Sequence, residues 1–296
     1  MKENMNIPDN IRSVEAAKTA SLWCKNLFPD WCTPPFQGEL QKIVSFGWEA
    51  KADEETIKNA GNWWLWMRNI FIENTMTRQM KEKMMRMAVN DQPITFVTTR
   101  SPELLHAQIG KGDPGLPRSR KSLLRLKNLA DQSAEFVSTH SLVMLADLSI
   151  DNEDKIKKVC DIESVILENI QKITDLSRDI GLEAEILRMS EHVILQPITQ
   201  IPSHAWPHIK KAMFESLGSH QREFGWTLEQ SESHNLDLAV SMGSVGLSIN
   251  QQPNHILLHN ESFISRGALN NIFTPPNDPI PVICLRDLVE KRKTKI

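Results

Sequence analysis

The residue types best suited to chemistry gather after two short apolar runs. Ile94–Val97 leads to Arg100 and Ser101, and Leu142–Leu145 leads to Asp147. The planar guanidinium of an arginine binds carboxylate or phosphate groups bidentately, and a carboxylate holds an ammonium group or moves a proton. Ser101 is a candidate substrate ligand rather than a nucleophile, because no GxSxG turn surrounds it. These side chains predict a site for a substrate with an anionic group and an amine.

A segment rich in glycine and basic side chains lies between the two runs. Residues 110–127 contain six basic side chains and one acidic one. The candidate anion ligands in this segment are Lys111, Arg118, Arg120, Lys121 and Arg125. The spacing of Arg118, Lys121 and Arg125 puts them on one helix face, as a phosphate clamp or an ordinary solvated face. Neither GxxxxGK[ST] nor GxGxxG is present, so the standard nucleotide cradles are not predicted.

A second polar group flanks a third apolar run. His255 and His259 enclose Ile256–Leu258 and face one side of a strand, and Glu261 follows. His259 and Glu261 are therefore a candidate acid/base pair, with ordinary loop hydrogen bonding as the alternative. The nine histidines form neither HExxH nor HxH, so no metal site is predicted.

These side chains can meet only if the apolar runs are neighbouring strands of one sheet. Residues 94–97, 142–145, 255–259 and 281–285 are mostly apolar rather than alternating, which is typical of strands covered on both faces. Helical patterns separate them along the chain. The sequence therefore predicts an α/β fold, a Rossmann-like and mostly parallel sheet flanked by helices, with its ligand crevice at the carboxyl ends of the strands.

The helices are predicted from apolar residues spaced by three or four positions and from stop signals. We expect them at Ser13–Phe28, at Glu55–Val89, at 153–180 before Gly181 with Asp151 as the N-cap, at Glu183–Leu195, and from Ser203 to Gly218.

The first 90 residues differ from the rest in composition. They hold six of the eight tryptophans, at positions 23, 31, 48, 63, 64 and 66, and no strand-like run. We expect residues 1–90 to form a helical region packed on an α/β domain at 91–296. The indoles either pack against the sheet or form the wall or lid of a pocket.

Composition narrows the class of protein. The formal net charge of -3 over 296 residues gives no general attraction to nucleic acids or acidic membranes. Cys24, Cys32, Cys160 and Cys284 show no CxxC pairing, which predicts neither a zinc site nor a disulfide framework and is typical of a reducing cytoplasm. The beginning of the chain lacks a signal-peptide pattern, and no run approaches the roughly 20 apolar residues of a membrane span. We expect a soluble cytoplasmic protein with no cofactor and no membrane contact.

Several short motifs together resemble those of the isonitrile synthase family. They are Arg100-Ser-Pro, Ile109-Gly110, Leu116-Pro, Ser122–Leu129, the run ending at Asp147 and, more distantly, Val245–Asn250. The likeness covers roughly a quarter of the chain. Arg100 stands where the family has lysine, Arg118 falls near an expected aspartate, and Leu148 replaces a glycine.

The resemblance implies a Rossmann-like enzyme of secondary metabolism. It would condense the amine of an amino-acid-like substrate with the carbonyl of a sugar phosphate. In that picture Arg100 and the basic residues after Gly110 meet the phosphate, and Asp147 orients the amine.

Two alternatives remain open. The order of elements is also similar to that of cyclodipeptide synthases, which use aminoacyl-tRNA, and a basic helix suits tRNA phosphates. This chain contains no tyrosine, whereas that family relies on tyrosines beside a nucleophilic serine. The other alternative is a non-catalytic binding protein that keeps the fold while its site has decayed.

Overall fold

Five parallel strands form the single sheet of the computed structural model, which describes residues 14–71, 76–90, 92–108, 110, 116–148, 157–259 and 268–284. The strands are β1 (Ile94–Arg100), β2 (Thr139–Leu145), β3 (Glu185–Arg188), β4 (His255–His259) and β5 (Val282–Cys284). Their spatial order is β3-β2-β1-β4-β5. The predicted Rossmann-like α/β class is confirmed, and the order reverses between β1 and β4.

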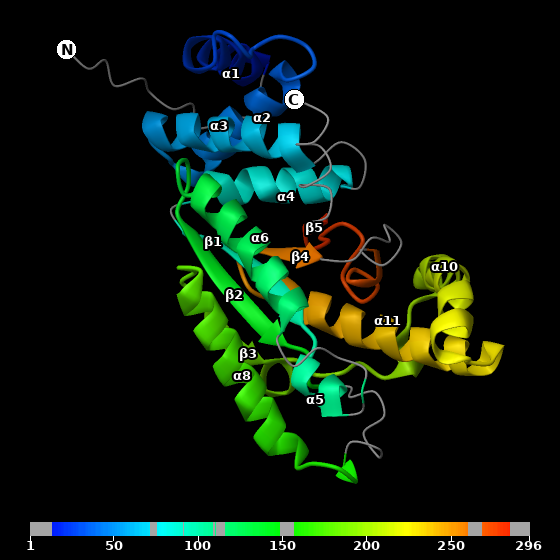
Figure 1. Cartoon of the computed structure of the whole chain (residues 1–296). Helices are drawn as coiled ribbons and strands as arrows, with labels where there is room; N and C mark the ends of the chain where they lie inside the picture. The colour runs from blue at the N-terminus through cyan, green and yellow to red at the C-terminus, as the bar shows by residue number, and fades with distance from the viewer. Residues whose placement is uncertain are drawn as a thin grey trace.

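The helices fall into three groups along the chain (Figure 1). The tryptophan-rich region forms α1 (Val14–Leu27), α2 (Gln37–Ala50), α3 (Glu54–Phe71) and α4 (Arg78–Ala88). Between the strands lie α5 (Glu103–Gln108), α6 (Pro117–Ser133), α8 (Ile162–Asp179) and α9 (Met189–His192). Two 3-10 turns, η1 (Ile198–Gln200) and η2 (Ser203–Ala205), lead to α10 (Trp206–Phe224) and α11 (Leu228–Asn250). Within the described ranges, no helix is both long and apolar enough to cross a membrane.

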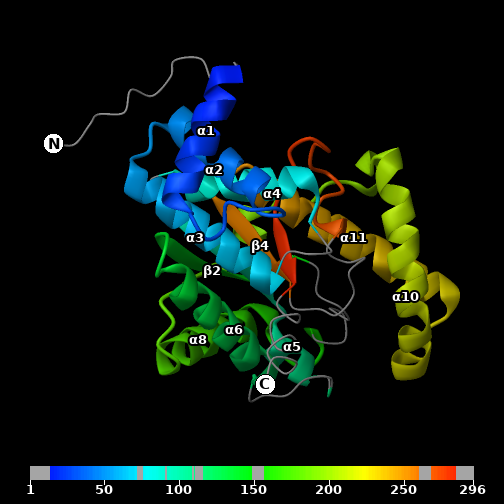
Figure 2. The ribbon, with the colours of Figure 1, turned by 90° about the horizontal axis from the view of Figure 1, so that it is seen from above.

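Helices cover both faces of the sheet. Phe96 and Val143 pack in one core with the helices α6 and α8, whereas Val97 and Met144, the next residues along the strands, pack with α11. Figure 2 shows α6 and α8 together on one side of the strands and α11 on the other. This two-sided cover explains why the strands are apolar at consecutive positions.

The tryptophans of α3 pack into the core at the amino-terminal end of the sheet. Trp63 and Trp64 are fully buried in the same cluster as Phe96. The Trp63 indole Nε1 donates a hydrogen bond to Ser133 Oγ at 3.2 Å, and Ser133 is the last residue of α6, just before β2 begins at Thr139. These two indoles therefore serve packing, and they do not form a lid over the opposite end of the strands.

Three of the expected helices differ in their limits. The pattern at 55–89 forms two helices, because Thr77 caps a new helix by accepting from Met80 N. The helix expected from 153 begins at 162 after its N-cap Asp161, so Asp151, which lies outside the described residues, does not cap α8. Gly218 does not end α10, because an interior glycine costs only about 1 kcal/mol in a helix and the chain continues to 224.

Tertiary contacts override the pattern in two further segments. The expected helix at 183–195 is instead β3 and α9, because Ile186 and Leu187 pair with Val143 and Met144 of β2. The helix α11 was not predicted, because its buried face includes small and polar residues rather than an apolar stripe. At Gly246 a Cβ atom would lie 1.6 Å from the carbonyl oxygen of Asn270, so only glycine permits this close contact.

Candidate functional site

The carboxyl ends of β1, β2 and β4 meet at one edge of the sheet, here named the carboxyl edge. Arg100 ends β1 rather than following it, and it lies opposite Leu145. The backbone N–H of Ala146 donates to the carbonyl of Arg100 at 2.7 Å, so Asp147 lies just beyond this pair. In β4, His259 comes one residue after Leu258, the partner of Thr98. The edge thus gathers Arg100, Asp147 and His259 around the point where strand order reverses.

The two faces of the sheet separate these residues. Arg100 continues the alternation of Phe96 and faces α6, where its guanidinium contacts Ser122. His259 continues the alternation of Leu257, whose side chain belongs to the core beneath α11. Arg100 therefore lies toward one face and His259 toward the other.

Buried polar contacts surround Arg100, which is 8% exposed. Its Nη1 donates to Ser122 Oγ, and its Nη2 lies 3.7 Å from Glu103 Oε1. The hydroxyl of Ser119 donates to the same carboxylate oxygen at 3.1 Å. These contacts tie the end of β1 to α5 and to the first two turns of α6.

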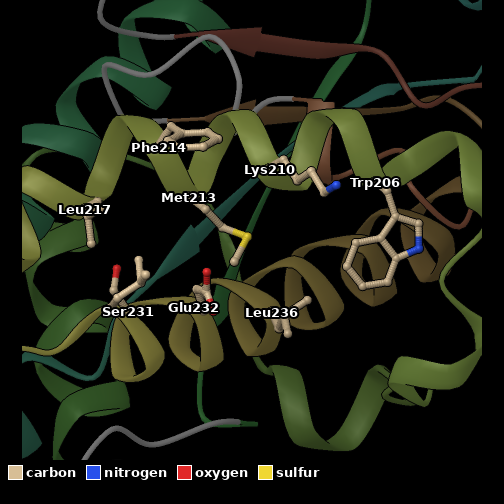
Figure 3. A pocket seen from close by; sticks show the side chains of 9 residues that line it. Trp206, Lys210, Met213, Phe214, Leu217, Ser231, Glu232 and Leu236 are labelled. Carbon is tan, nitrogen blue, oxygen red and sulfur yellow. The ribbon is translucent and has the colours of Figure 1, made fainter.

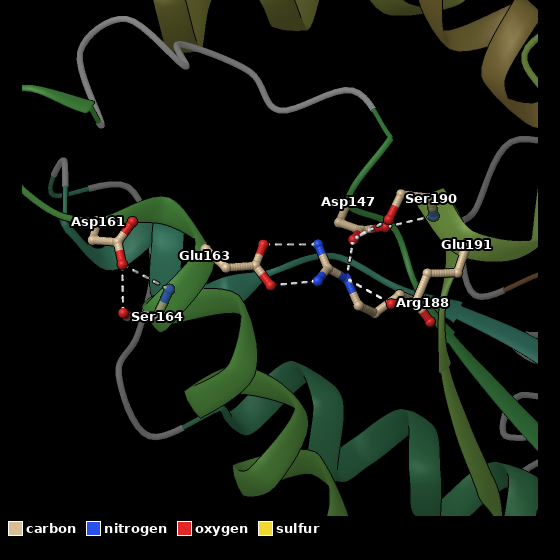
Figure 4. Close-up of polar contacts among 7 residues, drawn as sticks. All are labelled: Asp147, Asp161, Glu163, Ser164, Arg188, Ser190 and Glu191. Atoms are coloured by element: carbon tan, nitrogen blue, oxygen red, sulfur yellow. Dashed lines mark hydrogen bonds and ion pairs between the residues drawn. The ribbon is translucent and has the colours of Figure 1, made fainter.

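Asp147 belongs to a second network, in which Arg188 is the central residue (Figure 4). Its carboxylate accepts hydrogen bonds from Arg188 Nε at 2.8 Å, from the backbone N–H of Ser190 at 2.8 Å and from Ser190 Oγ at 2.7 Å. The guanidinium of Arg188 also reaches both carboxylate oxygens of Glu163 on α8. The network joins the end of β2 to β3, α9 and α8.

The environment of Asp147 favours its charged form. The side chain is fully buried, and burial by itself raises the pKa. The hydrogen bonds from Ser190 and Arg188 outweigh burial and hold the pKa of Asp147 below its ordinary value. Glu163 and Asp147 together raise the pKa of Arg188. Asp147 is therefore ionised at neutral pH.

The basic residues of α6 divide into exposed and partly buried members. Arg118, Arg120 and Lys121 are exposed, whereas Arg125 is half-buried and its Nε has no hydrogen-bond partner among the described residues. The three residues expected to form one clamp thus differ in environment. Exposure alone would also suit a solvated helix face.

The start of α6 is basic and receives no side-chain cap from its N-cap residue Leu116. Leu116 precedes the helix in a left-handed conformation with φ 54°. Backbone N–H groups at a helix start attract negative charge, and Arg118 and Arg120 add to that attraction. Because Arg100 contacts Ser122 in the second turn, this helix start lies at the carboxyl edge.

The remaining predicted ligands are placed as follows. Ser101 is exposed directly after β1, and His259 is half-buried at the end of β4. Lys111 and Glu261 lie outside the described residues. Those that the structure describes contain no group of three or more His, Cys, Asp or Glu side chains able to hold a metal ion.

The partners of Asp147 were not found from the sequence. Arg188 and Ser190 fall in a segment interpreted as a helix, and Glu163 is 25 residues from Arg188. The one usable signal was the apolar pair Ile186-Leu187, because a strand there would have placed Arg188 beside Asp147.

A groove of about 470 Å³ lies elsewhere, between α10 and α11 (Figure 3). It is lined by Trp206, Lys210, Met213, Phe214, Leu217, Leu228, Ser231, Glu232 and Leu236. None of the predicted site residues that the structure describes lines it. Its lining is mainly apolar, in contrast to the charged carboxyl edge.

Comparisons with known proteins do not decide the function. No model of a known protein family matches the chain. No curated protein matches it either. The function is therefore argued from the geometry of the carboxyl edge.

Proposed function

We propose that this protein is a biosynthetic enzyme that condenses or transfers a group on an amino-acid-like small molecule, with an anionic or phosphorylated co-substrate. One observation carries the proposal: strand order reverses between β1 and β4 beside the basic start of α6, where the N-cap residue Leu116 supplies no side-chain cap. In open parallel sheets, ligands bind in the crevice outside the strand ends at such a reversal.

The anionic group belongs at the start of α6. The backbone N–H groups of Arg118 and Ser119 and the side chains of Arg118 and Arg120 would supply the hydrogen bonds and the positive charge, since Pro117 has no N–H and the N–H of Arg120 already donates to the carbonyl of Leu116. Arg100 acts indirectly, because its contact with Ser122 holds this turn of α6 against β1. The exposed hydroxyl of Ser101 is available to the substrate on the same edge.

The charge around Arg188 supports an amine-bearing substrate. This single guanidinium lies within 4 Å of Asp147, Glu163 and Glu191, so three carboxylates face one cation. The excess negative charge attracts an ammonium group toward this part of the edge. His259 and Glu261 stay the candidate acid/base pair of this proposal, and His259 would act from the face of the sheet opposite to Arg100.

The resemblance to isonitrile synthases narrows the reaction. It favours attack of the amine on the carbonyl of a sugar phosphate, with Lys111, Lys121 and Arg125 as further phosphate ligands. The test measures the binding of inorganic phosphate and of a panel of pentose and hexose phosphates, by thermal shift and by calorimetry.

The decisive variant removes three exposed cations from α6. We expect Arg118→Ala/Arg120→Ala/Lys121→Ala to bind a sugar phosphate at least about tenfold more weakly, since charge-assisted hydrogen bonds contribute about 1.5–3 kcal/mol each. Arg78→Ala/Arg178→Ala/Lys211→Ala is the matched control, because it also removes three well exposed cations, which lie on α4, α8 and α10. If the α6 variant and the control bound the sugar phosphate with equal affinity, the proposed anion site at the start of α6 would be wrong. Comparing metabolites of cells with and without the gene then separates an enzyme from a binding protein.

An aminoacyl-tRNA-dependent enzyme is the second candidate, favoured by the exposure of Arg118, Arg120 and Lys121. Binding of tRNA would weaken steeply with salt, with a log–log slope of about -0.7 to -0.9 for each phosphate contacted. A sugar phosphate, which presents one phosphate group, would show a much shallower slope.

A further inference from the structure

Cys24 and Cys32, which no sequence motif pairs, are in contact in the fold. Cys24 lies on α1 and Cys32 lies in the turn that follows, and their Sγ atoms are 2.6 Å apart. Their eight-residue separation matches no CxxC motif, so the sequence indicated no pair.

The local backbone explains the contact. The N–H of Phe28 donates to the carbonyl of Cys24, and the N–H of Cys32 donates to the carbonyl of Phe28, both at 2.9 Å. Two successive steps of four residues bring Cys24 and Cys32 to one side of the chain. The ring of Phe28 packs closely on α3, where a Cβ at Gly61 would lie only 2.2 Å from it, so the turn has a defined position.

The two thiols differ in access to solvent. Cys24 is fully buried, whereas Cys32 is only partly buried. Burial, together with the neighbouring Cys32, raises the pKa of the Cys24 thiol to about 12. A dissolved oxidant therefore meets Cys32 first, and Cys24 is the adjacent resolving thiol.

We propose that Cys24 and Cys32 form a site of reversible oxidation that closes a disulfide in response to a peroxide. Hydrogen peroxide oxidises the Cys32 sulfur to a sulfenic acid and leaves as one water. The Cys24 sulfur then attacks the Cys32 sulfur, the S–O bond breaks, and the Cys24 proton leaves with the hydroxyl as a second water. Two thiols and one peroxide thus become one disulfide and two waters, and a dithiol reductant reverses the change.

The Cys24–Cys32 disulfide can be identified by mass spectrometry. Trypsin cleaves after Lys18, Lys25 and Lys42, so the disulfide joins peptide 19–25 to peptide 26–42. The reduced full-length chain is treated with hydrogen peroxide, alkylated with iodoacetamide, digested and analysed without reduction. We expect the linked pair, two hydrogens lighter than the sum of the free peptides, and its loss after dithiothreitol treatment.

Matched variants test the direction of the reaction. Cys160→Ser should leave the linked pair unchanged, whereas Cys32→Ser should abolish it. Cys24→Ser should leave a sulfenic acid on Cys32 that dimedone traps. The disulfide closes a short loop, so oxidation should raise the Tm of the wild type by roughly 4 °C. It should not raise the Tm of the two variants that lack Cys24 or Cys32.

The proposal is overturned if peroxide leaves both peptides separate. It is equally overturned if Cys32 links to Cys160, to Cys284 or to a second chain instead. Neither result depends on the carboxyl edge, so this inference stands or falls separately from the proposed function.

Discussion

The two ends of the sheet are stabilised in different ways. At the amino-terminal end, the indoles of Trp63 and Trp64 are buried among apolar side chains. At the carboxyl edge, the charged groups of Arg100 and Asp147 are buried and bound to partners from other elements. Apolar burial is non-directional, whereas a buried charge requires partners with defined geometry. The apolar core at the amino-terminal end therefore supplies a rigid scaffold, and the buried charges at the carboxyl edge are held in fixed positions by their partners.

The largest expected effect lies at the amino-terminal end. Trp63→Ala should lower the free energy of unfolding by about 3–5 kcal/mol, because it leaves a cavity in the core. Urea denaturation measures this loss. Trp31→Ala is the control, since Trp31 is 42% exposed, and it should cost less than about 1 kcal/mol. Similar losses in the two variants would show that α3 does not anchor this end.

At the carboxyl edge, Asp147→Ala should lower the free energy of unfolding by about 3 kcal/mol, because it leaves Arg188 and the backbone N–H of Ser190 without their acceptor. The same denaturation experiment measures the loss. Asp175→Ala on α8 is the matched control, since its pair with Arg178 is largely exposed and should contribute little. If the two variants lost equal stability, the Asp147 network would not hold the edge together.

Two serines compare the ends directly. Ser122→Ala removes an acceptor from the charged Arg100, and Ser133→Ala removes one from the neutral indole of Trp63. We expect losses of about 2 and about 1 kcal/mol respectively, because hydrogen bonds to charged groups are the stronger ones. Chemical denaturation of both variants gives the order. The reverse order would mean that Arg100 does not depend on α6.

The smallest effect concerns pH. The pKa of Asp147 is lower in the folded protein than its unfolded value of about 3.9, so its contribution is complete above that value. The contribution is lost as pH falls through the folded pKa. The Tm gap between the wild type and Asp147→Asn should therefore narrow below about pH 4. The gap to Trp63→Ala should not follow this titration, and parallel narrowing of both gaps would contradict the assignment.

Much of the fold could be predicted from local patterns. The run at 255–259 is β4 with the same limits, and Ile94–Val97 lies within β1. Such strands can be recognised in the sequence because each is covered on both faces and is therefore apolar throughout. The location of the candidate edge follows from the same pattern, since parallel strands end on one side.

Other features depended on contacts between distant segments. The segment 185–188 becomes a strand because β2 offers it hydrogen bonds, and α11 packs closely on residues 270–273 through its glycines, Gly246 against the backbone of Asn270 and Gly243 against the side chains of Ile272 and Phe273. Asp147 meets an arginine 41 residues further along the chain. No local pattern carries these partners, because hydrogen bonds and close packing are specific to three-dimensional neighbours.

The division is therefore physical. Periodicity in the chain reports which side of each element is apolar, and this was enough to predict the class of fold and to place Arg100, Asp147 and His259 at the carboxyl ends of the strands. Only the tertiary structure decided that Arg100 and Asp147 are buried within networks, that His259 faces the other side, and that Cys24 touches Cys32. Each of these depends on where separate elements pack, which spacing along the chain does not encode.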